Sequence, residues 1–285
     1  MNDRICLQKK YTILLTACIN PGDMIYTSVT DADIRRSQYM EALSFYLNEI
    51  DYPVVFVENT GTDISDHFER FIKEGRLEYL AFNGNEFDKK RGKGYGEAGI
   101  LEYAVCHSSF LQEADFIIKV TGRLKVLNII SLIRLHSMFL SRCDIQCILD
   151  LNSSFADSRL FIVTLDFLQN HFLVNKESIN DSEGVYLEHV LFDCVYRQAG
   201  CVFYPFFLRP RISGISGTSG QQYWDGNYFR VKLSHLHSML DYSSQYNHAH
   251  KSNSSRAERM VLKAMSRLVG MGECLLNMLK RKKIR

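Results

Sequence analysis

The residues that decide the fold are G-K-G-Y-G-E-A-G-I-L-E-Y-A-V at positions 92–105 and A-D-F-I-I-K-V-T-G-R-L-K-V-L-N at positions 114–128. The first segment predicts a glycine-rich turn and an amphipathic helix that begins at about Gly96. The second predicts a buried strand over residues 116–120, with Lys119 and Arg123 at its carboxyl end. Glycines let the backbone approach an anion closely, and the start of a helix offers free N–H donors. In α/β folds, ligands bind at the carboxyl ends of the strands, so we expect an anion site here.

Working outward, apolar and β-branched runs alternate with amphipathic segments. The sequence predicts strands at 11–19, 52–57, 77–82 and 116–120, and helices at about 34–50 and 64–74. Asp31 or Asp33 is expected to cap the first of these helices. Alternation at these lengths indicates right-handed βαβ units, so the predicted fold class is α/β with a mostly parallel sheet flanked by helices. Further along, helices are predicted at 129–139, 165–173, 183–198 and 228–242, and strands at 144–149, 159–164 and 202–207.

Charge is distributed unevenly along the 285 residues, although the formal net charge is only +2. Residues 251–285 hold ten Lys/Arg and two Glu, which is +8, so residues 1–250 carry −6 by difference. An acidic body argues against a nucleic-acid-binding protein, whose basic residues should lie on the folded domain. The eight cysteines contain no C-x-x-C pair, which favours reduced thiols in the cytoplasm over a metal site.

Three segments resemble, in order, the N-terminal half of GT-A glycosyltransferases, especially the bacterial family 2 type. They are P-V-V-F-V-E-N-T-G-T-D at 53–63, N-G-N at 83–85 with G-Y-G-E-A-G at 94–99, and A-D-F-I-I-K-V-T-G at 114–122. The resemblance covers about residues 11–130, and its wider character is similar to transferases of bacterial capsule and O-antigen assembly. It implies a GT-A-like, Rossmann-like domain over residues 1–245, with a nucleotide-binding half at 11–130 and an acceptor half at 131–245.

The chain departs from this family where an Asp-x-Asp motif would bind a divalent cation bridging the donor diphosphate. Lys119, Thr121 and Arg123 occupy that place, and they are poor cation ligands. Arginine and lysine can instead offset the charge on the leaving diphosphate directly. We therefore predict a transferase that needs no metal and no cofactor. The alternative for Arg123 is an ion pair with Asp115 or Glu97.

Other donor-binding candidates follow the remaining strands. Asn20, Glu58 and Asn59 would lie beside the base and ribose, although turn formation is an alternative for both asparagines. The glycine segment adds a set that would contact the diphosphate: Lys93, Gly94, Gly96 and Glu97. A solvated loop cation is the alternative for Lys93.

The best candidates for a catalytic base are Glu188 and then His189, in the apolar segment V-Y-L-E-H-V-L-F at 185–192. Sugar transfer with inversion needs a base for the acceptor hydroxyl, and the resemblance implies a carboxylate at a helix start beyond the metal motif. Desolvation in this setting would favour the neutral carboxyl, which suits a base working near neutral pH. The alternative is a salt bridge from Glu188 to Arg197 or Arg209.

The segment R-P-R-I-S-G-I-S-G-T-S-G at 209–220 has the composition of a mobile lid. Arg209 and Arg211 are expected to reach the phosphates from it. A surface connection without a binding role is the alternative.

Residues 246–285 are predicted to form a linker and a basic amphipathic C-terminal helix, which would bind an anionic membrane surface. A partner protein is the alternative for this helix. Together with the resemblance, the tail suggests a cytoplasmic protein, peripheral at the inner face of the cell membrane, that transfers a sugar to a lipid-linked oligosaccharide. An inactive scaffold of a glycan-assembly complex is the alternative, and a nucleotidyltransferase would need a carboxylate–metal cluster that the sequence does not offer.

Overall fold

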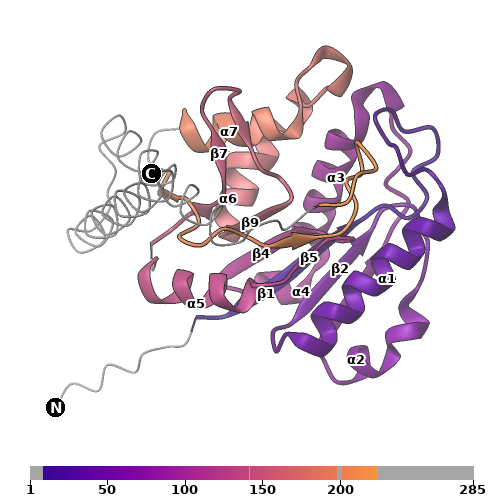
Figure 1. Cartoon of the computed structure of the whole chain (residues 1–285), viewed down its shortest axis with the longest axis horizontal. Helices are drawn as coiled ribbons and strands as arrows, with labels where there is room; N and C mark the ends of the chain where they lie inside the picture. The colour runs from indigo at the N-terminus through magenta and orange to yellow at the C-terminus, as the bar shows by residue number, and fades with distance from the viewer. Residues whose placement is uncertain (1–8, 141, 198–200, 224–285) are drawn as a thin grey trace, which may run out of the picture.

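The computed structural model describes residues 9–140, 142–197 and 201–223, and a seven-stranded sheet forms their centre (Figure 1). The strand order is β10-β6-β9-β4-β1-β2-β3. In that order the strands are Phe203–Tyr204, Ile145–Gln146, Leu160–Val163, Phe116–Thr121, Tyr11–Ala17, Val54–Glu58 and Leu77–Ala81. All pairings are parallel except those of β9, which runs antiparallel to both β4 and β6.

Helices cover both faces of the sheet and make it the middle of three layers. The helices are α1 Ala32–Glu49, α2 Glu69–Lys73, α3 Gly92–His107, α4 Ser109–Gln112, α5 Ile129–Phe139, α6 Leu165–Phe167 and α7 Leu187–Tyr196. Short 3-10 or π turns lie at η1 Ser65–Phe68, η2 Lys89–Arg91, η3 Leu168–Phe172, η4 Leu173–Ser178 and η5 Asp181–Glu183. Small pairs of strands form at β5 Lys125–Val126 with β11 Ile212–Ser213, and at β7 Leu149–Asp150 with β8 Phe155–Ala156.

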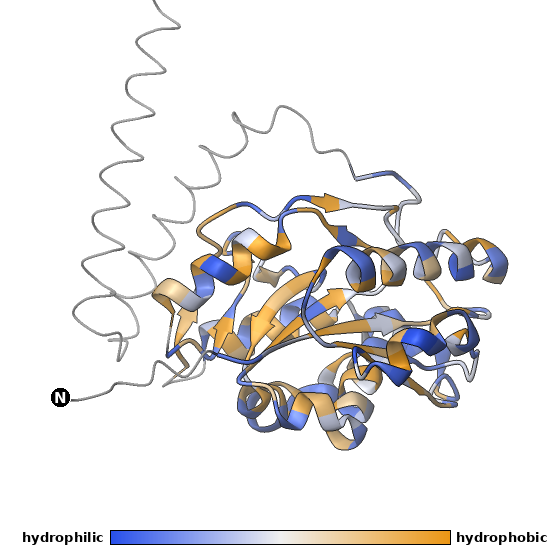
Figure 2. Cartoon of the chain, turned by 90° about the horizontal axis from the view of Figure 1, so that it is seen from below, coloured by the Kyte–Doolittle hydropathy of each residue, from blue (hydrophilic) through white to orange (hydrophobic). Residues whose placement is uncertain are grey.

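Two apolar cores follow from the alternation of side chains along the central strands. Leu14 of β1 belongs to the core beneath α3 and α7, whereas Ile13 and Leu15 belong to the core beneath α1 and α5. Figure 2 shows the strands as hydrophobic segments between more hydrophilic helix surfaces. Because both faces are covered, the central strands read as continuous apolar runs rather than as an alternating pattern.

The predicted fold class is confirmed, and several local predictions need correction. The strand expected at 144–149 is divided into β6 and β7, which belong to different sheets, and the helix expected at 165–173 is α6 followed by the π turn η3. The helix expected at about Gly96 begins at Gly92, so the glycines form its first turns rather than a preceding loop. The helix expected from residue 183 begins at Leu187, because residues 180–185 form a turn closed by pairing of Asn180 with Val185. Asp31 caps α1 as predicted, since its carboxylate accepts from the N–H groups of Asp33 and Ile34 at 2.9 Å.

The predicted C-terminal helix and linker at 246–285, and the helix at 228–242, lie outside the described residues. No helix within the described ranges is long and apolar enough to cross a membrane. The division into halves at residue 130 and the domain boundary at residue 245 stay predictions.

Candidate functional site

A cleft lies at the carboxyl edge of β1 and β4, where the strand order changes direction: β2 and β3 lie on one side of this pair, β9 and the rest on the other. Such a change of direction leaves a crevice in which α/β folds bind ligands. The cleft has an inner cavity of about 100 Å³ and an outer cavity of about 410 Å³. The residues that line both cavities, and so form their junction, are Lys93, Glu97, Thr121, Arg123 and Gly217.

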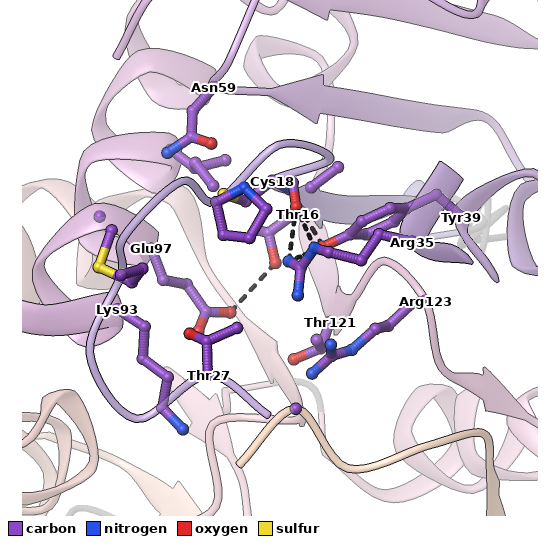
Figure 3. Close-up of a pocket in the computed structure, with 16 residues that line it drawn as sticks. Thr16, Cys18, Thr27, Arg35, Tyr39, Asn59, Lys93, Glu97, Thr121 and Arg123 are labelled. Atoms are coloured by element: carbon purple, nitrogen blue, oxygen red, sulfur yellow. Dashed lines mark hydrogen bonds between the residues drawn. The ribbon is translucent and has the colours of Figure 1, made fainter. Parts of the chain in front are cut away.

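Arg123 is the cation whose position best fits an anion (Figure 3). It follows β4 directly, after Gly122, where an added methyl group would lie 2.7 Å from the carbonyl oxygen of Thr16. Its Nε and Nη1 are buried, and no other described residue accepts a hydrogen bond from either atom. A buried donor without a partner is costly, and more so when it is charged. The alternative ion pair with Asp115 or Glu97 does not form, so these two nitrogens face the cleft without an acceptor among the described residues.

The ammonium group of Lys119, by contrast, already has protein partners for its charge and its hydrogen bonds. Its side chain is fully buried and forms an ion pair with Glu97. Its Nζ also donates to the carbonyl of Ser158 at 2.5 Å and lies 3.5 Å from the hydroxyl of Thr121. The prediction that Lys119 contacts the diphosphate has no support in this geometry, because its donors point at protein acceptors. Thr121 lies between the two cations and lines both cavities.

The first turn of α3 does not cradle an external anion, which corrects the interpretation of its glycines. The carboxylate of Asp181 occupies that position and accepts from the N–H of Gly94 at 3.4 Å. A methyl group added at Gly92 would lie 2.2 Å from Oδ2 of Asp181, and Gly92 has φ +82°. The glycines therefore allow Asp181 to approach the helix, and burial raises the pKa of that carboxyl.

The next turns of α3 do face the cleft. Gly96 lines the inner cavity, and Lys93 and Glu97 line both cavities. Figure 3 shows Lys93 and Glu97 among the side chains around the inner cavity. The ammonium of Lys93 donates to the hydroxyl of Thr218. A neutral hydroxyl does not neutralise this charge, so a phosphate would be a stronger partner for it.

The residues after β1 and β2 have different roles from one another. Asn59 is 2% exposed and lines the inner cavity, and its Oδ1 is buried without a hydrogen-bond donor among the described residues. Glu58 is fully buried and outside the lining. Its carboxylate accepts from the N–H groups of Ile19, Thr60 and Thr62 at 2.8–2.9 Å, which holds the two loops together. Asn20 is exposed, outside the lining of either cavity, and its carbonyl accepts weakly from Asn85 at 3.4 Å.

Glu188 lies in the outer cavity, near the start of α7. Its Oε1 accepts from the hydroxyl of Ser158 at 2.7 Å, and burial raises the pKa of the carboxyl above its usual value. The alternative salt bridge to Arg197 or Arg209 does not form, and Arg197 pairs with Asp193 instead. His189 is outside the lining of the outer cavity. Its Nδ1 lies 3.1 Å from the carbonyl of Gly184, and its side chain takes part in capping the start of α7.

The 209–220 segment crosses the cleft with its backbone rather than with its arginines. The side-chain amide of Asn128 holds the backbone of this segment: it donates to the carbonyl of Arg209 and accepts from the N–H of Arg211. Neither arginine lines the inner or the outer cavity. Residues 214–220 instead form a roof: Gly217 lies so close that a methyl group there would be 1.9 Å from Nη2 of Arg123. The carbonyl of Gly217 accepts from the N–H of Ser28 at 2.9 Å, which joins this roof to the loop after β1.

Sequence reasoning missed Arg35, Asp157, Arg159 and Tyr223, all of which line the cleft. Arg35 donates to the carbonyl of Cys18 at 2.8 Å and fixes the loop after β1. Arg159 forms a two-point ion pair with Asp157, at 2.9 and 2.6 Å, and its guanidinium stacks on the Tyr223 ring at 4.8 Å. Asp157 and Arg159 come just before β9, and nothing in the sequence around them indicates a binding role. They reach the cleft because β9 runs antiparallel to β4, which brings the start of β9 to the carboxyl end of β4.

No group of three or more His, Cys, Asp or Glu side chains within residues 9–140, 142–197 and 201–223 is placed to hold a metal ion.

Comparisons with known proteins add a fold-level likeness. No protein-family model and no curated protein sequence matches the chain. Similar solved structures include an active-site mutant of LgtC, with 10% identity, a TM-score of 0.45, and coverage of 68% of this chain and 72% of that one. Another is the mannosyltransferase Ktr4p from S. cerevisiae, with 12% identity, a TM-score of 0.38, and coverage of 72% and 70%. A cytidylyltransferase from Leptospira borgpetersenii shows 13% identity, a TM-score of 0.37, and coverage of 87% and 98%.

These similarities are too distant to carry a functional argument. The GT-A-like fold class rests on the sheet itself: its order, its single antiparallel strand β9, and its helices on both faces.

Proposed function

We propose that the chain is a glycosyltransferase that moves a sugar from a nucleotide-sugar donor to an acceptor glycan. The observation that supports this most directly is that Nε and Nη1 of Arg123 are buried at the cleft without a hydrogen-bond partner among the described residues. In this proposal the diphosphate of the donor lies against Arg123 and Lys93, and the nucleoside enters the inner cavity beside Asn59. Arginine suits this task because its planar donors can make paired contacts to phosphate oxygens.

The outer cavity would receive the sugar and the acceptor. Glu188 lies there with a raised pKa, which is the property expected of a base that removes a proton near neutral pH. The acceptor hydroxyl would attack the reacting sugar carbon while Glu188 takes its proton. The bond from that carbon to the diphosphate oxygen breaks, and the electron pair leaves with the diphosphate.

We also propose that transfer needs no divalent cation. A metal normally neutralises the leaving diphosphate, and here Arg123 and Lys93 would supply positive charge at the same position. The acidic pair of the family is replaced by Lys119, Thr121 and Arg123. The same replacement favours the second candidate, an inactive scaffold that keeps the fold without the reaction.

Calorimetric titration with UDP, CDP and GDP, each with and without EDTA, tests these proposals. We expect one nucleotide to bind with the same affinity in both conditions. No binding to any of the three would remove the enzyme proposal and leave the scaffold. Binding that disappears only with EDTA would remove the metal-free proposal alone.

For the acceptor, we propose a lipid-linked oligosaccharide in the assembly of bacterial capsule or O-antigen. The support is the basic pattern of residues 251–285, which fits a protein that is peripheral at the cytoplasmic face of the membrane. The full chain should sediment with vesicles containing phosphatidylglycerol but not with pure phosphatidylcholine vesicles. Sedimentation should weaken at high salt, because charge attraction is screened. Equal binding to both vesicles would contradict the membrane proposal.

A further inference from the structure

A lysine in the middle of a central strand needs an explanation. Lys119 lies on β4, and its side chain is fully buried, although most lysines keep their ammonium in water. Burying a charge is costly unless it is paired and hydrogen-bonded. The fold therefore bears a cost at Lys119 that an apolar residue would avoid.

The partners of Lys119 all lie at the cleft. Its Nζ pairs with the carboxylate of Glu97 from α3 and donates to the carbonyl of Ser158, just before β9, at 2.5 Å. The hydroxyl of Thr16, at the end of β1, donates to the same Glu97 oxygen at 3.1 Å. Glu97 is therefore held from two strands at the junction of the inner and outer cavities.

Ser158 continues the network to the second carboxylate. While its carbonyl accepts from Lys119, its hydroxyl donates to Oε1 of Glu188 at 2.7 Å. The result is one continuous chain of contacts, Glu97–Lys119–Ser158–Glu188, which joins α3, β4, the residues before β9, and α7. We call it the carboxylate network.

We propose that Lys119 is a positioning residue that holds Glu97 at the cavity junction and, through Ser158, holds Glu188 in the outer cavity. It is not a ligand of the donor diphosphate. This inference rests on the proposed function, because it assigns the two carboxylates to the place where the sugar would lie. The diphosphate is left to Arg123 and Lys93.

The electrostatics of Glu188 agree with the network. Burial is the main cause of its raised pKa, the Ser158 hydroxyl lowers it, the charge of Glu97 raises it, and that of Lys93 lowers it. The other charged residues lining the outer cavity are Arg123, Asp150, Asp157 and Arg159. Changes at Glu97 and at Ser158 should therefore move the Glu188 pKa in opposite directions.

The first experiment compares UDP affinity by calorimetry in three variants. Lys119→Met should keep the dissociation constant within about threefold of wild type, whereas Arg123→Ala should raise it by at least tenfold, the loss expected for hydrogen bonds to a charged group. Lys125→Met is the matched control, because Lys125 pairs with Glu41 away from the cleft lining. A tenfold loss in Lys119→Met, with the control unchanged and the variant folded, would overturn the inference.

The second experiment keeps the buried lysine and needs no nucleotide. The Glu188 pKa is measured by ¹³C NMR of its carboxyl group in wild type, Glu97→Gln and Ser158→Ala. We expect a lower value in Glu97→Gln, which removes a like charge, and a higher value in Ser158→Ala, which removes a hydrogen bond to the ionised form. No movement in either variant would contradict the network. Because this result does not depend on UDP, it remains decisive if no nucleotide binds and the proposed function fails.

Discussion

Arg123 is the residue on which the assignment of the cleft depends. Replacing it with Ala should cost about 1.5–3 kcal/mol of nucleoside diphosphate binding, because the bonds lost are charge-assisted. That is roughly a 10- to 150-fold rise in the dissociation constant. The free energy of unfolding without ligand should not fall, since the variant removes two buried, charged N–H groups that have no partner among the described residues.

Calorimetry and denaturant unfolding check this prediction. The matched control is Arg70→Ala, an arginine on α2 whose side chain is 79% exposed and pairs with Glu74. An Arg123→Ala variant that binds UDP as tightly as this control would remove the diphosphate assignment.

Glu188 is the candidate base, and its replacement by Gln tests that role. Glu188→Gln should keep nucleotide affinity and abolish sugar transfer, because Gln retains the shape and the Ser158 contact but cannot take a proton. In the wild type, transfer should fall as the pH drops through the raised Glu188 pKa, above the range of an ordinary glutamate. Nucleotide release from a panel of UDP- and GDP-sugars measures this, and unchanged turnover in Glu188→Gln would retire Glu188 as the base.

The same raised pKa makes a prediction about stability. The folded state favours the neutral carboxyl, so Glu188 lowers stability as the pH rises through its unfolded and then its folded pKa. Glu188→Gln should therefore be more stable than wild type at neutral pH, with the gain disappearing below pH about 4, where both groups are uncharged. Thermal unfolding at several pH values checks the sign.

At the scale of single elements, α3 contains two glycines that should respond in opposite ways. Gly92 has φ +82° and ψ −179°, a region open essentially to glycine alone, and it abuts Asp181. Gly92→Ala should therefore destabilise the protein by about 1–3 kcal/mol from the backbone alone. Gly99 lies within the same helix with open space around it, so Gly99→Ala should stabilise by roughly 0.5–1 kcal/mol.

Urea unfolding of the two variants provides the measurement, with each acting as the control for the other. Equal effects in both would contradict the claim that the start of α3 is built to accommodate Asp181. Nucleotide binding in Gly99→Ala should match wild type, because Gly99 lies outside the lining of both cleft cavities.

For the whole molecule, the cleft is closed by segments far apart in the sequence. The loop after β1 contacts the 214–220 roof through Ser28 and Gly217, and Lys93 contacts the same roof through Thr218. A bound nucleotide should slow amide hydrogen exchange in both segments, because the contacts it adds oppose local opening of the backbone. Exchange in α2, away from the cleft, serves as the internal control. Protection confined to α2 would show that the ligand binds elsewhere.

Much of this architecture was predictable because it depends on local pattern. The apolar runs that became β1, β2 and β4 are buried on both faces, β3 was predicted as the strand that follows β2 in the chain, and Asp31 was identified as a possible cap. Arg123 and Asn59 were predicted as site residues because they follow central strands, and both line the cleft. The reason is general: in a parallel sheet, the end of every strand is carried to one edge.

Other parts depend on contacts that no local pattern encodes. A sequence shows that Lys119 and Arg123 are cations beside a strand end, but not which of them finds a carboxylate. Register and packing bring Glu97 and Ser158 to Lys119, and leave Arg123 beneath Gly217. Likewise, the glycines of α3 predicted a close approach to an anion, and the anion is the carboxylate of Asp181, supplied from 87 residues away.

The sequence alone thus determined which strands form the centre of this protein and at which edge its cleft lies, because the apolar runs and their ends can be recognised from the order of residues. Only the tertiary structure decided which charges are paired and which face the cleft. Partners such as Lys119 and Ser158 lie on different parts of the chain. The antiparallel direction of β9 places Ser158 and Arg159 at the cleft, beside the carboxyl end of β4. That direction is a property of the assembled sheet and not of residues 160–163 by themselves.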